Sequence, residues 1–219
     1  MILAGICWLF SGLNQAMSQA PGAAAQALIA ASGRGDVARV ESLLAAGAGV
    51  HARDARGRTA LLAATHGNHV EVARRLIAAG ADVNAKDEIQ DSAFLYAGAE
   101  GRLEILKMTL AAGADLKSTN RFGGTALTPA CHHGHVETVK ALLATDIEVD
   151  QVNRLGWTAL LEAVILGNGG KAHTEIVRLL LARGAKPDRA DRDGVTPLAH
   201  AERRGYREIA RLLRAAGAS

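Results

Sequence analysis

The chain has 219 residues, of which 49% are apolar and only 3% aromatic, so its core has to be built from small and aliphatic side chains. Charged residues make up 21% of the chain, a near-average share that argues against a disordered protein. The formal net charge is +3, and Lys and Arg are interleaved with acidic residues instead of forming a block, which argues against a nucleic-acid-binding protein.

Residues 1–20 differ in composition from the rest of the chain. They read MILAGICWLFSGLNQAMSQA, with no charged side chain, an apolar run over 2–13 and a small residue, Ala20, at the end. The pattern resembles a secretory signal peptide and predicts a periplasmic or secreted mature chain; with the richness in Ala, Gly and Arg it indicates a bacterial source. No Lys or Arg precedes the apolar run, so the alternatives are a hydrophobic N-terminal helix on a cytoplasmic protein or a misassigned start codon. The run is shorter than the ~20 apolar residues that span a bilayer, so we expect no membrane insertion.

A period of 33 residues, lengthened once to 38, runs through the remainder of the chain. Thr59, in the segment GRTALLAA, has equivalents at these steps at Ser92, Thr125, Thr158 and Thr196. The glycine in LIAAGADVN follows the same steps, with the series Gly47, Gly80, Gly113, Asp146, Gly184 and Gly217. Because two independent markers share one period, the chain is predicted to be an array of repeated structural units.

Each unit is predicted to hold two short amphipathic helices. In one unit the apolar residues recur at helical spacing, first as Ala60, Leu61 and Ala64 and then as Val70, Ala73, Leu76 and Ile77. A glycine between the helices and another after the second helix supply the positive φ that such turns need. One helix pair cannot bury its own apolar face, so neighbouring pairs have to stack. The predicted fold is an all-α repeat solenoid with short β-hairpin or turn fingers.

The segment 57–87, GRTALLAATHGNHVEVARRLIAAGADVNAKD, resembles the ankyrin repeat almost throughout, and TPLAHA (196–201) keeps part of the same family pattern. The resemblance covers about nine tenths of the chain and implies a non-catalytic protein-binding module. It predicts a degenerate N-terminal capping repeat at 21–54 and a C-terminal capping repeat at 192–219. Between them lie four repeats, at 55–87, 88–120, 121–153 and 154–191. The repeat at 88–120 is weak, and the one at 154–191 carries an insertion at 167–172 between its helices.

Several positions depart from the family pattern. The histidine that the family carries three residues after the Thr is absent from every unit. The 88–120 unit has Gln90 in place of the glycine at its fingertip and Thr109 in place of a core leucine. Asp146 replaces a glycine after a second helix, and we expect it to take the left-handed conformation, which Asp adopts more readily than most residues.

One segment, ACHHGHVETV (130–139), gathers potential metal ligands within five positions, namely Cys131, His132, His133 and His135. In the repeat register His135 corresponds to His69 and His173, and Cys131 to small residues, so both have structural explanations. His132 and His133 are adjacent on one helix and diverge, whereas zinc needs ligands that converge at ~2.0–2.3 Å. We therefore predict no metal and no cofactor. The alternative is a metal- or redox-linked accessory protein that uses these four side chains.

Catalytic groups do not stand out from the repeat pattern. The sequence shows no nucleophile with a base, no paired carboxylates and no phosphate-binding glycine loop outside the repeats. The two cysteines, Cys7 and Cys131, are too few for a disulfide framework. We predict that the chain is not an enzyme.

A recognition surface is the remaining prediction. Positions that the repeat leaves free are the fingertips and the exposed face of each first helix, and apolar or aromatic residues occupy tips in three consecutive units. Exposed apolar clusters and Trp, Tyr or Arg anchors are typical of protein interfaces. We expect a monomer that binds a protein partner through its concave groove and fingertips, mainly across the units at 88–191. The alternative is that these side chains pack sideways within the stack. The predicted contact residues are Arg56, Arg58, His66, Ile89, Phe122, His132, His133, Leu155, Trp157, Ile165 and Leu166.

Overall fold

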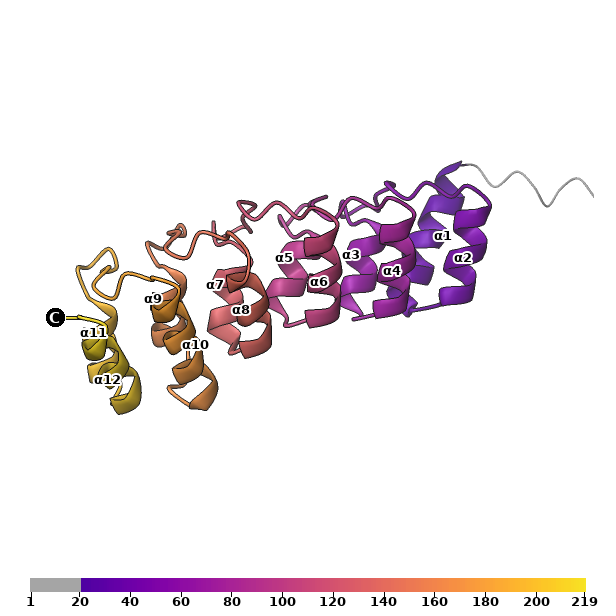
Figure 1. Cartoon of the computed structure of the whole chain (residues 1–219). Helices are drawn as coiled ribbons and strands as arrows, with labels where there is room; N and C mark the ends of the chain where they lie inside the picture. The colour runs from indigo at the N-terminus through magenta and orange to yellow at the C-terminus, as the bar shows by residue number, and fades with distance from the viewer. Residues whose placement is uncertain (1–20) are drawn as a thin grey trace, which may run out of the picture.

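A computed structural model describes residues 21–219, so the predicted signal peptide lies outside the described residues. The described chain forms twelve helices in six consecutive pairs, which stand in a row from the N-terminal to the C-terminal end (Figure 1). This arrangement confirms the predicted all-helical solenoid. The helices are α1 (Pro21–Arg34), α2 (Val37–Ala45), α3 (Ala60–His66), α4 (Val70–Ala78), α5 (Ala93–Ala99), α6 (Leu103–Ala111), α7 (Leu127–His133), α8 (Val136–Leu143), α9 (Ala159–Ile165), α10 (Lys171–Ala182), α11 (Pro197–Arg203) and α12 (Arg207–Ala215).

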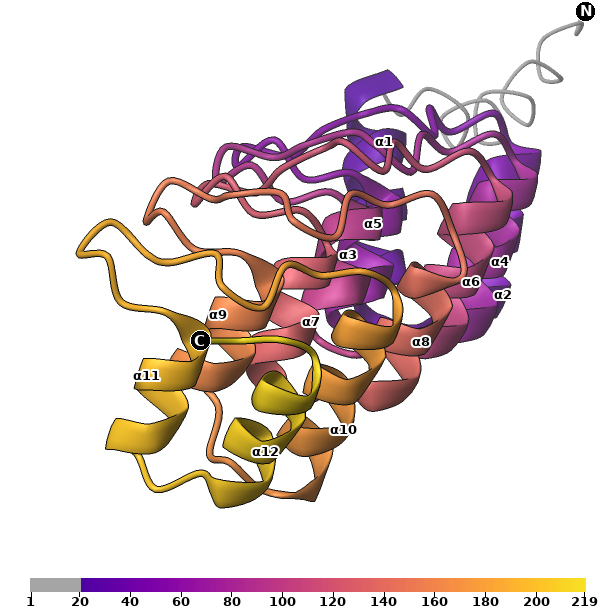
Figure 2. The same ribbon diagram turned by 60° about the vertical axis from the view of Figure 1, so that its left-hand side comes forward.

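The helices lie in two layers. Odd-numbered helices pack on one another from α1 to α11, and even-numbered helices do the same from α2 to α12. Fingers connect each even-numbered helix to the next pair, and they project over the side of the odd-numbered helices (Figure 2). The fingers consist of hydrogen-bonded turns, and residues 21–219 contain no strand. No helix in this range is both long and apolar enough to span a bilayer.

The core runs continuously along the row between the two layers. In α3 every residue from Ala60 to Thr65 is buried, because neighbouring odd helices cover both sides and α4 covers a third. Small residues allow the close approach: a Cβ at Gly98 would lie 2.7 Å from the Cβ of Ala126. Thr109 is fully buried where a leucine was expected, and its hydroxyl donates to the carbonyl of Leu106 at 2.8 Å, so the polar group is satisfied.

Four odd helices begin at the Thr or Ser that marks the period. The side-chain oxygens of Thr59, Ser92, Thr158 and Thr196 accept the N–H of the residue three positions later. Thr125 does not cap α7. Pro129, four residues later, has no N–H to donate to the Thr125 carbonyl, which instead accepts from Thr128 at 3.2 Å. The Thr125 hydroxyl is then buried without a hydrogen-bond partner.

The end of α8 differs from the prediction. Gly47, Gly80, Gly113 and Gly184 have positive φ after their helices, but Asp146 does not adopt the left-handed conformation. Instead, the Thr145 hydroxyl donates to the carbonyl of Leu142 at 2.6 Å and accepts from the Ile147 N–H at 3.3 Å. With a left-handed residue at position 146, backbone groups would make the bonds that end the helix. Here the side chain of Thr145 makes them instead.

The insertion lies only partly in the turn where it was predicted. The turn between α9 and α10 covers residues 166–170, and α10 has 12 residues whereas α4 has 9. The remaining inserted residues lengthen α10 at its start, so His173 lies inside that helix. The Tyr206 hydroxyl donates to the Gly167 carbonyl at 2.9 Å and fixes the turn to the last helix pair.

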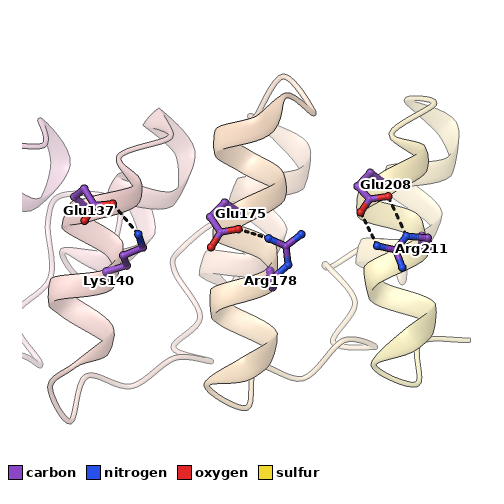
Figure 3. Close-up of polar contacts among 6 residues, drawn as sticks. All are labelled: Glu137, Lys140, Glu175, Arg178, Glu208 and Arg211. Carbon is purple, nitrogen blue, oxygen red and sulfur yellow. Dashed lines mark hydrogen bonds and ion pairs between the residues drawn. The ribbon is translucent and has the colours of Figure 1, made fainter.

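Five of the six even helices, α4 to α12, carry the same charge pattern on their outer surface. In each of these five a Glu pairs with a Lys or Arg three residues later, as Figure 3 shows for α8, α10 and α12. The Glu137–Lys140 pair has a distance of 2.8 Å, and α4 and α6 contain equivalent pairs. In α2 Glu41 pairs instead with Arg75 of α4, at 2.8 Å. Exposed pairs of this kind add little stability.

Candidate partner-binding site

Each finger is shaped by an Asp or Asn that lies five residues before the Thr or Ser marker or its equivalent. Its side-chain Oδ1 accepts the N–H groups of the residues two and four positions later, as Asn153 does from Leu155 at 2.9 Å and Trp157 at 3.0 Å. Such a bridged turn holds the fingertip in a fixed conformation. This group was not predicted, although it recurs in the sequence at the steps of the repeat, three of 33 residues and one of 38: Asp54, Asp87, Asn120, Asn153 and Asp191.

Three predicted fingertip side chains are exposed. Ile89, Phe122 and Leu155 are exposed by 50%, 51% and 47% in three consecutive fingers. Adjacent fingers are hydrogen-bonded through the backbone, with the Arg154 N–H donating to the Phe122 carbonyl at 2.8 Å. Packing against neighbouring fingers therefore leaves about half of each side chain uncovered. Trp157 differs, because it is half-buried at the base of its finger instead of at the tip.

Two of the three predicted basic contacts around the second helix pair are engaged within the chain. Arg58 is half-buried and pairs with Asp54 at 2.7 Å. The half-buried His66 stacks on Tyr96, with ring centroids 4.0 Å apart, and burial lowers its pKa from the ordinary value. Arg56 is exposed at the fingertip. Of these three predicted contacts, only Arg56 presents an exposed side chain.

A cleft of about 380 Å³ lies where the fingers meet the inner helices α5, α7 and α9. Five predicted contact residues border it, namely Phe122, His132, His133, Leu155 and Leu166. Ile89, Trp157 and the half-buried Ile165 do not. The other lining residues come from three consecutive repeats and are not among the eleven predicted contact residues: Asp91, Tyr96, Ala99, Glu100, Asn120, Arg121, Gly124, Thr128, Pro129, Asn153 and Glu162.

Glu162 is the most unusual residue of the cleft. It lies on α9 and is only 8% exposed, and its Oε1 accepts a hydrogen bond of 2.7 Å from the Asn153 side-chain amide. Burial raises the pKa of this carboxyl to about 7, against the opposing effects of the Asn153 hydrogen bond and the His133 charge. Other repeats have Ala63, Tyr96, Pro129 or His200 at the equivalent position, so the acid is specific to this unit.

The histidines bind neighbouring repeats to one another. The ring of His69 bonds to the Gly33 carbonyl at 3.1 Å, and that of His173 to the His132 carbonyl at 2.8 Å. His133 Nδ1 lies 2.7 Å from the Ala99 carbonyl oxygen. These contacts are structural. For His69 and His173 a structural role was predicted from their equivalent positions in the repeat.

The segment 130–139 does not bring ligands together. Cys131 is fully buried, and burial raises the pKa of its thiol well above the ordinary value, with the Glu162 charge adding to the rise. The rings of His132 and His133 have centroids 4.5 Å apart, and His135 packs against Gly101. Within residues 21–219 no three His, Cys, Asp or Glu side chains are grouped so that they could hold a metal ion. Nothing in this geometry favours the metal- or redox-linked alternative.

Comparison with known proteins gives consistent matches. The sequence matches the family described as "Ankyrin repeats (3 copies)" over residues 5–87, 27–120 and 94–191, and "Ankyrin repeats (many copies)" over 170–214. No curated protein matches it. Among solved structures, an ankyrin repeat domain from Acinetobacter baumannii AYE is 58% identical with a TM-score of 0.85, covering 88% of this chain and 98% of that one.

Two further solved structures are similar. The ankyrin repeat protein EF0377 from Enterococcus is 40% identical with a TM-score of 0.83, and the alignment covers 87% of this chain and 97% of that one. The ankyrin repeat domain of Bcl-3, a member of the IkappaB family, is 28% identical with a TM-score of 0.78, covering 88% and 86%. These matches extend over nearly all of the described helices.

Proposed function

Because this chain belongs to the ankyrin repeat family, we propose that it is a non-catalytic module that binds a protein partner through its fingers and inner helices. Repeats of this kind generally serve as protein-interaction modules, and stacking gives them an extended surface on one side. The contact area we propose runs across the fingers that carry Ile89, Phe122 and Leu155 and includes the cleft below them.

The row of exposed apolar fingertips is the observation that carries this proposal. Fingertips are normally polar, and contiguous apolar side chains on a protein surface usually mark a contact site. The Asp or Asn bridge in each finger holds the tips in place before binding, which reduces the entropy lost on association. The outer layer, by contrast, presents Glu–Lys and Glu–Arg pairs that already satisfy one another (Figure 3).

Capture from the native source tests the proposal. The full chain serves as bait beside a Phe122→Ala/Leu155→Ala variant, because both side chains are half-exposed and their truncation leaves the core intact. A Lys140→Ala/Arg211→Ala variant changes the outer layer and is the matched control. We expect one partner that the wild type and the control retain and the fingertip variant loses. Equal retention by all three proteins would contradict a fingertip site.

Location and assembly form a second part of the proposal. The composition of residues 1–20 supports export, and N-terminal sequencing of the native protein should then begin beyond residue 20. A native protein that begins at Met1 would contradict export. We expect a monomer, and light scattering of the purified chain would show a dimer if this is wrong.

A further inference from the structure

The cleft combines an acidic base with an apolar rim. Glu162 lies on α9, and Asp91 and Glu100 border the same cleft from the 88–120 repeat. Phe122, Leu155 and Leu166 form the rim and are among the four large apolar side chains that are exposed in the described chain. Of these acids only Glu162 is buried, and a buried carboxylate is unfavourable unless a cation or hydrogen-bond donors reach it.

Lys and Arg side chains of the described chain provide little positive charge to these carboxyls. Within the described residues neither Glu100 nor Glu162 forms an ion pair, and the only partner of Glu162 is the Asn153 amide on Oε1. Asp91 faces Arg121, but the distance of 3.7 Å from Oδ2 to Nη1 is longer than a hydrogen bond. Oε2 of Glu162 therefore remains available to a donor that enters the cleft.

The two histidines of the cleft do not donate to Glu162. A carbonyl oxygen can only accept, so the contact of 2.7 Å with Ala99 puts a proton on Nδ1 of His133 and commits that donor to the Ala99 carbonyl. Burial, together with the charges of His133 and His173, lowers the pKa of His132 from its ordinary value. Within the described residues the hydrogen bond to Glu162 comes from Asn153 and not from either ring.

Arg121 shows how a guanidinium group is held at this rim. Its central carbon lies 4.8 Å from the centroid of the Phe122 ring, and one end of the group is directed to Asp91. Stacking on an aromatic ring while binding a carboxylate is characteristic of arginine and not of lysine, whose charge is compact. Arg121 stays at the rim with about half of its side chain exposed, so the deeper carboxyl of Glu162 is still without a cation.

We propose that the cleft receives one arginine side chain of the protein partner, with its guanidinium group against Glu162 and its stem along Phe122 and Leu155, while Glu100 adds negative charge at the border of the cleft. This inference rests on the proposed function, since it assumes that a protein docks on the fingers. An acidic or phosphorylated side chain would meet the like charge of the Glu162 carboxylate. An apolar side chain would cover Glu162 without neutralising it, which is unfavourable for a buried carboxylate.

A pair of small probes tests the chemistry of the cleft without the partner. Acetyl-arginine amide and acetyl-citrulline amide have nearly the same shape, but only the first is charged. NMR titration of the full isotope-labelled chain at about pH 7.5 should show saturable shifts at the amides of Tyr96, Asn153 and Glu162 with the arginine probe alone. Equal shifts with both probes, or no saturable shift with either, would overturn the inference.

Three variants locate the binding group. Glu162→Gln keeps an oxygen for the Asn153 amide but removes the charge, and a lost charged hydrogen bond is expected to weaken binding of the arginine probe by about tenfold. Glu100→Gln, on the half-exposed side of the cleft, should weaken it less and covers the case in which the first variant misfolds. Glu137→Gln on the outer layer is the control and should bind like the wild type. Unchanged binding by both cleft variants would refute the assignment.

The same variants separate this inference from the proposed function. If Phe122→Ala/Leu155→Ala loses the partner while Glu162→Gln and Glu100→Gln retain it fully, the fingers bind a protein and the arginine cleft is wrong. If the fingertip variant also retains the partner, the proposed function itself fails. Loss of the partner by the fingertip variant and by Glu162→Gln supports both.

Discussion

Replacement of Glu162 by Gln is expected to stabilise the folded chain, and to do so only when the pH is high enough to ionise the carboxyl. Burial raises the pKa of Glu162 from 4.5 to about 7, whereas the unfolded chain keeps the ordinary value. The folded state therefore holds the proton more tightly. The stability that this provides is complete below about pH 4.5 and is lost as the pH rises towards 7, where the folded protein has to ionise a buried group.

The magnitude follows from the size of the shift. A change of about 2.5 pKa units corresponds to roughly 3.4 kcal/mol at a pH well above 7, since each unit is worth about 1.36 kcal/mol. At pH 5 the penalty is still below roughly 1 kcal/mol, because the unfolded carboxyl is only partly ionised there. Gln is neutral at both values and retains an acceptor for the Asn153 amide. The gain from Glu162→Gln should thus be larger by roughly 2.5 kcal/mol at pH 8.5 than at pH 5.

Urea unfolding at the two pH values and constant ionic strength measures this difference. Trp157 is the only tryptophan among residues 21–219 and lies in the same repeat as Glu162, so its fluorescence follows the relevant unit even if the array unfolds in steps. Glu137→Gln is the control, because Glu137 is exposed on α8 and should show no comparable dependence on pH. An equal effect of Glu162→Gln at both pH values would refute the reasoning, as would a loss of stability at pH 8.5.

Three further predictions follow from individual residues. Gln90 has a φ of 66°, so Gln90→Gly should raise the free energy of unfolding by about 1 kcal/mol, and an unchanged urea midpoint would argue against strain at this fingertip. Phe122→Ala should change that free energy by less than about 0.5 kcal/mol, because half of the side chain is exposed; a larger loss would mean that it packs into the stack. Cys131, tested in a Cys7→Ser background, should react with Ellman's reagent only after unfolding, and rapid labelling of the folded chain would contradict its burial.

The repeat fold could be predicted because its signals are local. Most helix starts, turns and glycine positions depend on bonds between residues a few positions apart, and they recur with the period. Two departures from the repeat have local causes. Thr125 does not cap its helix because Pro129 changes which N–H groups are present, and Asp146 is not left-handed, contrary to the expectation, because Thr145 supplies the competing bonds. Predicting either outcome requires knowing which of several possible hydrogen bonds forms.

The site was predicted less completely than the fold. Phe122 and Leu155 could be identified from the repeat register, because fingertip positions are free of packing constraints. Trp157 and Ile165 belong to the same segments, yet the structure half-buries them outside the cleft. Glu162 was missed, since a single acid on a helix is unremarkable until its surroundings are known. Its replacement of Ala, Tyr, Pro and His at the equivalent positions was the one available signal.

The sequence by itself determined the unit, the period and the side of the array on which free positions gather, because those depend on contacts within a repeat or with an identical neighbour. Only the tertiary structure decided which free positions stay exposed, and that Asp91 and Glu100 of one repeat and Glu162 of another border one cleft with Phe122 and Leu155. The reason is that burial and charge pairing depend on what the adjacent repeats place nearby. A periodic pattern describes what the repeats share, whereas this cleft is made by the residues in which they differ.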